Sequence, residues 1–238
     1  MRVKQLLTCL LILWGSIAAH AYDFDLNGVY YNITDAENKT VEVTFVETGE
    51  GNADFYHGDV TIPGRVSNDN VTYTVTAIGD DAFHYCSSLT SVTVGSNVTR
   101  IGSRAFMKCT NLQSITLPDG LQHIGYSAFD DCYALANLDI PSTVTEIEGS
   151  AFSDCRSFTS LVLPEGITTI GEYFMDNCAG IKEFSIPKSV TTIASNAFGG
   201  TAFTSVYVFW ETPIAIASGL FPSRSNATLF VPFGSQAL

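Results

Sequence analysis

A pattern of apolar residues recurs in this chain with a constant period of 23 residues. The first copy runs from Ile78 to Arg100, and the six copies begin at Ile78, Ile101, Ile124, Ile147, Ile170 and Ile193. A constant period of about 20 to 29 residues is typical of a solenoid, in which each repeat forms one coil that buries its apolar side against its neighbours. The sequence therefore predicts a stack of six coils over residues 77–208.

One position of the repeat carries a large apolar side chain in every copy. An Ala-Phe pair supplies it in most copies, whereas the fifth copy has Phe174-Met175, so that bulk is exchanged between adjacent positions. The position is occupied by Phe83, Phe106, Phe129, Phe152, Met175 and Phe198. Because stacked repeats place equivalent residues above one another, this column indicates a core ladder rather than a cofactor pocket.

Each copy also contains a run of alternating apolar and polar residues, which is typical of a strand with one buried side. We expect strands at 89–94, 112–117, 135–140 and 158–163, aligned in a parallel sheet on the concave side of the stack. A second extended piece, such as 98–101, leads to the Ala-Phe segment, which we interpret as a short helical turn on the convex side. The expected class is therefore α/β and rich in β structure.

The segments that flank the repeats have other predicted roles. Residues 1–21 combine Arg2 and Lys4 with an apolar run and an Ala-His-Ala site, as in a signal peptide. Residues 22–76 are predicted to form an N-terminal β cap, and residues 209–238 a C-terminal cap, because the end coils would otherwise expose an apolar layer. The strand-like runs of the N-terminal cap are 28–34, 39–46, 59–62 and 70–75.

The start of the N-terminal cap also imitates a calcium-binding loop. Residues 23–28 read Asp-Phe-Asp-Leu-Asn-Gly, but Thr34 occupies the twelfth position, where such a loop has a bidentate glutamate. We therefore expect no calcium there.

The charge balance excludes two classes of partner. The formal net charge is −13, and removal of the predicted signal peptide makes it about −15. A negative field of this size repels nucleic acids and anionic membrane surfaces, which require clusters of Lys and Arg. No later run reaches the roughly 20 apolar residues that a membrane span needs, so we expect neither a nucleic-acid partner nor membrane insertion of the mature chain.

The repeated residues carry a family resemblance. The pattern Ile-Gly-x-x-Ala-Phe-x-x-Cys-x-x-Leu-x-Ser-Val/Ile, completed by Ile-Pro and Val-Thr, resembles the BspA-type leucine-rich repeat. The resemblance implies a secreted or surface-exposed bacterial protein that mediates adhesion, with fibronectin-like or fibrinogen-like proteins as candidate partners. It supplies no catalytic motif. In similar chains a short helix often follows a segment like 229–234; it is missing here, which implies an incomplete C-terminal cap.

Residues that could carry catalysis are scattered. His57, His84 and His123 lie in different parts of the pattern, and the carboxylate pair Glu146 and Glu148 is of a kind that more often faces solvent. No constellation passes the geometric requirements of an active site, so we expect no enzyme, no cofactor and no metal site. A glycan-binding or scaffold module is the alternative to a protein-binding adhesin, although Tyr207 is the one aromatic residue predicted on the concave sheet.

Five cysteines of the predicted mature chain share one repeat position: Cys86, Cys109, Cys132, Cys155 and Cys178. Secretion favours disulfides, but equivalent side chains of stacked coils point the same way rather than toward each other. We therefore predict buried free thiols that act as small apolar core residues.

The predicted binding surface lies on the concave sheet, where the outward positions change from small polar residues to a more varied set. Neighbouring strands lie about 4.8 Å apart, so these residues span a strip wide enough for a protein epitope. The candidate binding residues are Gln113, Thr116, Asn137, Asp139, Val162, Lys182, Glu183 and Tyr207.

Overall fold

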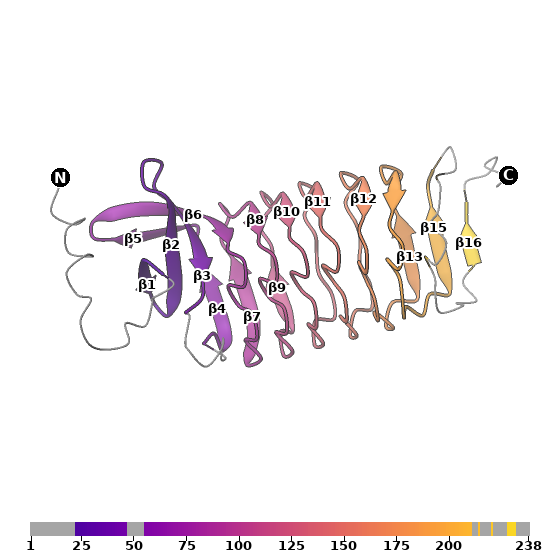
Figure 1. The fold of residues 1–238 in the computed structure, drawn as a ribbon, viewed down its shortest axis with the longest axis horizontal. Helices are drawn as coiled ribbons and strands as arrows, with labels where there is room; N and C mark the ends of the chain where they lie inside the picture. The colour runs from indigo at the N-terminus through magenta and orange to yellow at the C-terminus, as the bar shows by residue number, and fades with distance from the viewer. Residues whose placement is uncertain (1–21, 47–54, 211–213, 215–219, 221–227, 232–238) are drawn as a thin grey trace, which may run out of the picture.

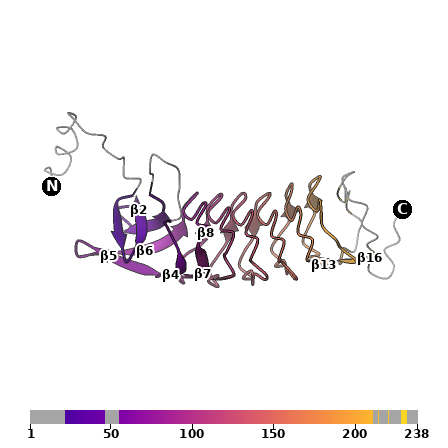
Figure 2. The same cartoon turned by 90° about the horizontal axis from the view of Figure 1, so that it is seen from below.

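The computed structural model describes residues 22–46, 55–210, 214, 220 and 228–231, which form an elongated row of coils behind an N-terminal β region (Figures 1 and 2). The predicted signal peptide and most of the predicted C-terminal cap lie outside the described residues. No described segment forms a helix that could cross a membrane. The strands are β1 (Phe24–Leu26), β2 (Val29–Asp35), β3 (Thr40–Thr44), β4 (Gly58–Ile62), β5 (Arg65–Asn68), β6 (Val71–Ile78), β7 (Leu89–Val94), β8 (Arg100–Ile101), β9 (Ser114–Thr116), β10 (His123–Ile124), β11 (Glu146–Ile147), β12 (Thr169–Ile170), β13 (Glu183–Ile186), β14 (Thr192–Ile193), β15 (Ser205–Val208) and β16 (Thr228–Phe230).

The N-terminal region begins with a two-residue hairpin. Asn27 and Gly28 join β1 to β2 with φ angles of 51° and 79°, the left-handed conformation that such turns require. The residues that imitate a calcium loop are therefore an Asn-Gly hairpin, and Asp23 Oδ2 accepts a hydrogen bond from the backbone N–H of Ile33 at 2.7 Å. The four predicted strand runs correspond to β2, β3, β4 and β6, whereas β1 and β5 were not predicted.

Consecutive repeats lie side by side and pair through two rows of parallel strands (Figure 1). The short-strand row contains β6, β8, β10 and β11, followed separately by β12 and β14. The long-strand row contains β4, β7 and β9, followed separately by β13, β15 and β16. Paired residues of the regular copies are one period apart, as in Ile101 and Ile124, whereas β13 and β15 pair at 22 residues, as in Ser185 and Tyr207. Each copy therefore forms one coil.

The long-strand row is less continuous than the sequence predicts. The predicted strand 112–117 is reduced to β9, and no strand forms at residues 135–140 and 158–163. Burial still alternates there, since Leu135 and Leu138 are buried while Asn137 is exposed. Asn137 has a low strand propensity, and its Oδ1 accepts hydrogen bonds from two hydroxyls of the next coil.

The predicted helical turns are not found among the described residues; the Ala-Phe segments form tight turns instead. Each coil has two residues at positive φ four positions apart, such as Asp81 (58°) and Tyr85 (63°), which an α-helix cannot accommodate. The backbone N–H of Phe83 donates to the carbonyl of Ala105 in the next coil at 2.7 Å, rather than within a helix. Hydrogen bonds between neighbouring coils therefore replace the hydrogen bonds of a helix. The Ala-Phe segments form a third side of the stack, beside the two rows of strands, and we call this side the turn edge.

The predicted aromatic column forms the core. The rings of Phe83, Phe106, Phe129 and Phe152 follow one another at 4.9, 5.3 and 5.9 Å between centroids, with interplanar angles of 12°, 6° and 13°. Tyr56 of the N-terminal region extends the column, because its ring lies 4.3 Å from that of Phe83. Its hydroxyl donates to the carbonyl of Thr44 at 2.6 Å, so the first coil is covered by a side chain whose polar end is bonded.

The five repeat cysteines are free and buried, as predicted. Each of the last four donates its Sγ–H to a phenylalanine carbonyl of the preceding coil, as in Cys132 to Phe106 at 3.2 Å. Burial raises the pKa of the Cys178 thiol to about 12 and that of Cys155 well above its usual range. These thiols therefore pack and bond as core groups.

Candidate functional site

The predicted binding residues lie on the outward side of the long-strand row, in three lines that cross the coils. The first line contains Gln113 and Lys182, the second contains Asn137 and Glu183, and the third contains Thr116, Asp139, Val162 and Tyr207. All are exposed except Tyr207, which is half-buried. The structure thus places all eight on one side of the molecule, which we call the long-strand face.

The third line has the most distinctive chemistry. Val162 exposes 75% of its surface, which is unusual for an aliphatic side chain in a regular repeat. One coil before it stands the exposed Asp139, and two coils after it stands Tyr207. The Tyr207 ring stacks on Phe230 of β16, with centroids 4.7 Å apart and an interplanar angle of 14°. The line therefore offers a carboxylate, an aliphatic group and an aromatic pair.

Two of the predicted binding residues are engaged within the fold. Asn137 Oδ1 accepts hydrogen bonds from Thr159 Oγ1 at 3.0 Å and Ser160 Oγ at 3.1 Å. Lys182 Nζ donates to the carbonyl of Ala179 at 2.9 Å. A partner would have to compete for these groups, so the third line is the more accessible part of the face.

A second cluster, which the sequence reasoning missed, lies on the short-strand row. His123 and Glu146 are direct neighbours in β10 and β11 because exactly one period separates them. His123 Nε2 lies 2.9 Å from Glu148 Oε1 and 3.8 Å from Glu146 Oε2. The backbone N–H of Tyr126 donates to Glu148 Oε2 at 3.0 Å. The signal was present in the sequence, since a period of 23 residues places position 123 beside position 146.

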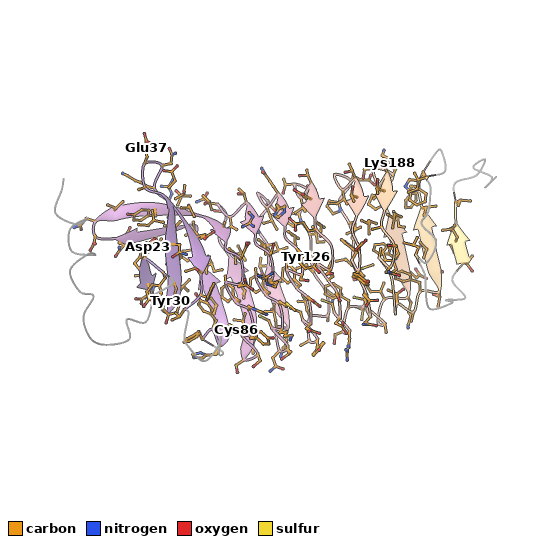
Figure 3. All side chains as sticks on the ribbon, in the orientation of Figure 1. Asp23, Tyr30, Glu37, Cys86, Tyr126 and Lys188 are labelled. Atoms are coloured by element: carbon orange, nitrogen blue, oxygen red, sulfur yellow. The ribbon has the colours of Figure 1, made fainter. Side chains whose placement is uncertain are left out.

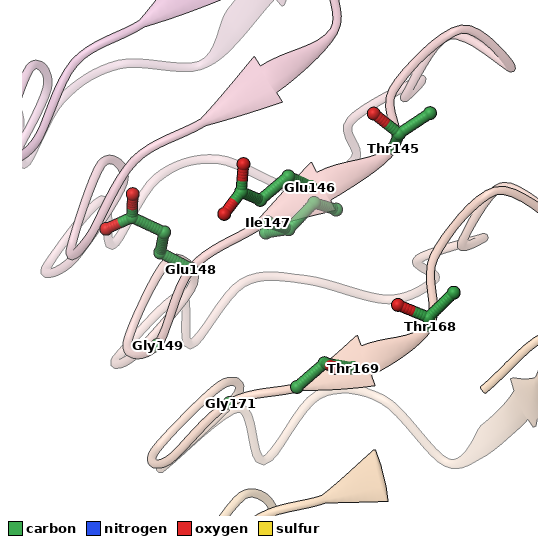
Figure 4. Close-up of a pocket in the computed structure, with 8 residues that line it drawn as sticks. All are labelled: Thr145, Glu146, Ile147, Glu148, Gly149, Thr168, Thr169 and Gly171. Carbon is green, nitrogen blue, oxygen red and sulfur yellow. The ribbon is translucent and has the colours of Figure 1, made fainter. Parts of the chain in front are cut away.

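The cluster adjoins a groove of about 590 Å³ between β11 and β12 (Figure 4). Glu146 and Glu148 line it together with Thr168, Thr169 and Gly171. No backbone hydrogen bond joins β11 to β12 among the described residues, unlike the other neighbouring short strands of consecutive coils. The groove therefore coincides with an interruption of the short-strand row.

A third polar cluster lies on the turn edge and consists of Asp130, Asp131 and Asp154. Burial and the neighbouring carboxylates raise the pKa of Asp130 to about 6. Arg156 Nη2 pairs with Asp154 Oδ1 at 2.7 Å and neutralises part of this charge. Figure 3 shows the side chains on all the coils. Exposed acidic groups are common without a bound ion, so this cluster is not by itself distinctive.

Comparisons with known proteins agree with the repeat architecture. Six copies of the BspA type leucine rich repeat region match residues 76–204. No curated protein matches the chain.

Three solved structures illustrate the likeness. A leucine rich cell surface protein from Faecalibacterium prausnitzii is 32% identical with a TM-score of 0.67, and the match covers 77% of this chain and 48% of that one. A leucine-rich repeat protein from Bacteroides ovatus is 22% identical with a TM-score of 0.56, covering 89% of this chain and 68% of that one. The pneumococcal vaccine antigen PcpA is 22% identical with a TM-score of 0.60, covering 78% of this chain and 49% of that one.

These structural matches differ in how much they establish about the chain. The structures that are 22% identical show the fold alone. The match to the Faecalibacterium prausnitzii protein is stronger, although this chain spans only about half of its length. Together with the six matched repeats over more than half of the sequence, it establishes that the chain belongs to the BspA-type leucine-rich repeat family.

Proposed function

We propose that this protein is a secreted or cell-surface adhesin whose coils form a solenoid that binds an extracellular protein through the long-strand face. Its partner would be a host matrix or plasma protein of the fibronectin or fibrinogen kind. The family and the described cell-surface relative support display outside the cell. The predicted signal peptide and the negative net charge fit the same location.

The observation that carries the proposal is the third line of the long-strand face. Protein interfaces are anchored by a few apolar or aromatic groups surrounded by polar ones. Asp139, the exposed Val162 and the stacked pair of Tyr207 and Phe230 supply this combination. Because the coils beneath are tied by their core and by backbone bonds, these groups are held in place before binding, which lowers the entropic cost.

A glycan-binding module is the second candidate, and one observation favours it. Aromatic rings are favourable surfaces for the apolar faces of sugars, and Tyr207 and Phe230 present two stacked rings at the end of the row. However, the third line also contains the aliphatic Val162, and Lys182, a cationic group on the same face, is already bonded to Ala179. We therefore rank protein binding first.

Binding to immobilised fibronectin and fibrinogen, compared with binding to a carbohydrate array, distinguishes the two candidates. For the protein-binding function, we expect the double variant Asp139→Ala/Tyr207→Ala to weaken binding at least tenfold at unchanged thermal stability. The basis is that interface anchors typically contribute about 2 kcal/mol or more each.

Matched changes elsewhere on the surface provide the control. Asp25 and Tyr126 are exposed, and they belong to β1 of the N-terminal region and to the turn edge. Asp25→Ala/Tyr126→Ala removes the same two side-chain types, so it should leave binding unchanged. Loss of binding in this control together with full binding by the Asp139/Tyr207 variant would show that the face is wrongly assigned. Binding to glycans alone would favour the second candidate.

A further inference from the structure

We infer that His123, Glu146 and Glu148 form a binding site for a divalent transition-metal ion, with zinc as the best match. The site is separate from the long-strand face, because its residues belong to β10, β11 and the residue that follows β11. The inference is therefore independent of the proposed adhesive function.

The three side chains converge from two coils. One nitrogen and two carboxylate oxygens lie within 4.8 Å of one another. A tetrahedral zinc ion with ligand distances of about 2.0 to 2.2 Å places its ligand atoms about 3.3 Å apart. The distances from His123 Nε2, 2.9 Å to Glu148 and 3.8 Å to Glu146, bracket that value. The two carboxylates are at most 4.8 Å apart, so an ion could enter with side-chain shifts of about an ångström or less, judged from the same tetrahedral geometry.

The backbone explains why the side chains converge. His123 and Glu146 are register partners in adjacent parallel strands, so their side chains project on the same side of the row. Glu148 follows at i+2 on its strand and therefore points to that side as well. Figure 4 shows the carboxylates of Glu146 and Glu148 on the side of β11 that faces away from Thr168 and Thr169. The parallel pairing thus holds the ligands before any ion binds.

The sequence departs from its own repeat at this site. Gly79, Gly102, Gly125 and Gly171 follow the first isoleucine of their copies, but the fourth copy has Glu148 and the sixth has Ala194. A side chain at this position is unfavourable in neighbouring coils, since a Cβ added to Gly125 would lie 2.7 Å from the backbone of Gly102. A carboxylate therefore occupies a position that is glycine in four of the six copies, and it turns toward a histidine.

The ligand types select the class of ion. Calcium and magnesium prefer oxygen ligands, whereas an imidazole nitrogen suits zinc and the other first-row transition metals. Two carboxylates bring two negative charges, which balance a divalent ion. Glu146 exposes 67% of its side chain, so the ion has a path from solvent and keeps a coordination position for water.

The groups that surround the three ligands determine the expected affinity for zinc. A zinc-bound histidine usually donates its other ring N–H to an acceptor, but His123 Nδ1 is buried without a partner. With three protein ligands and no such support, the site should bind more weakly than a closed four-ligand structural site. The simpler account, a hydrogen bond between His123 and Glu148 alone, predicts no stoichiometric binding.

Isothermal titration calorimetry of tag-free, chelator-treated protein with zinc chloride tests the inference. We expect one zinc ion per chain, with calcium chloride giving no comparable binding. Glu148→Gln and Glu146→Gln keep the size of the side chain but remove its charge, and each should lower zinc affinity at least tenfold. Failure of the unaltered protein to bind one equivalent of zinc would overturn the inference.

Matched controls separate the site from general surface binding. His57 and Glu172 are exposed and lie outside the cluster, so His57→Ala and Glu172→Gln should bind zinc as the unaltered protein does. Thermal unfolding in the presence of chelator verifies that all variants fold. Zinc should raise the melting temperature of the unaltered protein and the controls but not of the two site variants. An equal rise in all five proteins would assign zinc to other surface groups and would also overturn the inference.

Discussion

In the first three coils, residues 78–146, neighbouring rings of the aromatic column stack almost parallel, whereas in the last three, residues 147–208, Met175 interrupts the column and the rings that contact it come from other repeat positions. Phe106 and Phe129 differ by 6°, but Phe152 meets Phe174 at 84° and Phe198 meets Phe184 at 62°, while Phe184 and Phe203 stack beside the column at 6°. The ring separation also increases from 4.9 to 5.9 Å toward the fourth coil. The constant repeat period therefore specifies that each copy places a large apolar side chain at this core position, but it does not specify how that side chain is oriented.

The residue beside the first isoleucine also differs between the two halves. Gly79, Gly102 and Gly125 allow the backbones of the first coils to approach closely. The fourth coil has Glu148 instead, and the short-strand row is interrupted directly after it, between β11 and β12. The interruption coincides with this substitution, while the turn edge continues across it, as in the bond from the Ser150 N–H to the carbonyl of Glu172.

Removal of an aromatic ring from the closely stacked half should have the largest effect. Phe106 is fully buried between Phe83 and Phe129, so Phe106→Ala should lower the free energy of unfolding by about 3 to 5 kcal/mol. Met175 occupies the same slot in the fifth coil, and Met175→Ala should have a smaller effect of about 2 kcal/mol because less surface is lost. Urea midpoints measure both. A larger shift for the Met175 variant would contradict the comparison.

A methyl group between the closely packed coils should have the next largest effect. Gly125→Ala forces a Cβ against the backbone of Gly102 and Ser103, which should lower stability by about 1 to 3 kcal/mol. The sixth coil already has Ala194 at this position and still bonds to Ile170, so Ala194→Gly should change stability by only about 0.5 to 1 kcal/mol. Thermal unfolding of the two variants measures the difference, and equal effects would show that both halves pack alike.

Removal of the Tyr56 hydroxyl should measure how much its hydrogen bond stabilises the N-terminal end of the stack. Tyr56→Phe keeps the ring against Phe83 but removes the bond to Thr44, which should lower stability by about 0.5 to 1.5 kcal/mol. A control is Tyr126→Phe, because that tyrosine is exposed. An unchanged urea midpoint for Tyr56→Phe would show that the ring alone closes the stack.

The pH dependence of stability in the alkaline range tests the same N-terminal end of the stack. Burial raises the pKa of Tyr56 above its usual value of 10.0 and that of Tyr31 to about 12. The folded state therefore favours the neutral phenols, so their contribution is complete below pH 10 and decreases as the pH rises toward 12. Stability measured across this range should fall, and it should fall less in Tyr56→Phe. A stability that is independent of pH between 10 and 12 would contradict this assignment.

The smallest expected effect concerns the rate at which the buried thiols are alkylated. All five repeat cysteines should resist alkylation in the native protein, because the thiols are buried and the pKa of Cys155 is raised far above its usual range. Cys178 lies after the interrupted short-strand row, so it should react before Cys132 through local opening. Peptide mass spectrometry after timed alkylation measures the order. Five adducts should form after denaturation without reductant, and fewer would indicate disulfides.

The sequence alone determined the repeat, its buried positions and the free state of the thiols. These follow from periodicity, because stacked coils force equivalent residues into the same environment: Phe83, Phe106, Phe129 and Phe152 are all fully buried. The same reasoning placed Val162 and Asp139 on the outward side of the coils, where they are exposed. Alternation along one strand was sufficient for that assignment.

Only the tertiary structure decided how the coils pair. The turn edge contains no helix among the described residues, because left-handed residues such as Asp81 and Tyr85 direct backbone bonds to the next coil. The convergence of His123 with Glu146 and Glu148 likewise depends on the register between strands rather than on any local motif. Local sequence specifies which side of a strand a residue occupies, but contacts between coils depend on how separate copies align in space, which no local pattern encodes.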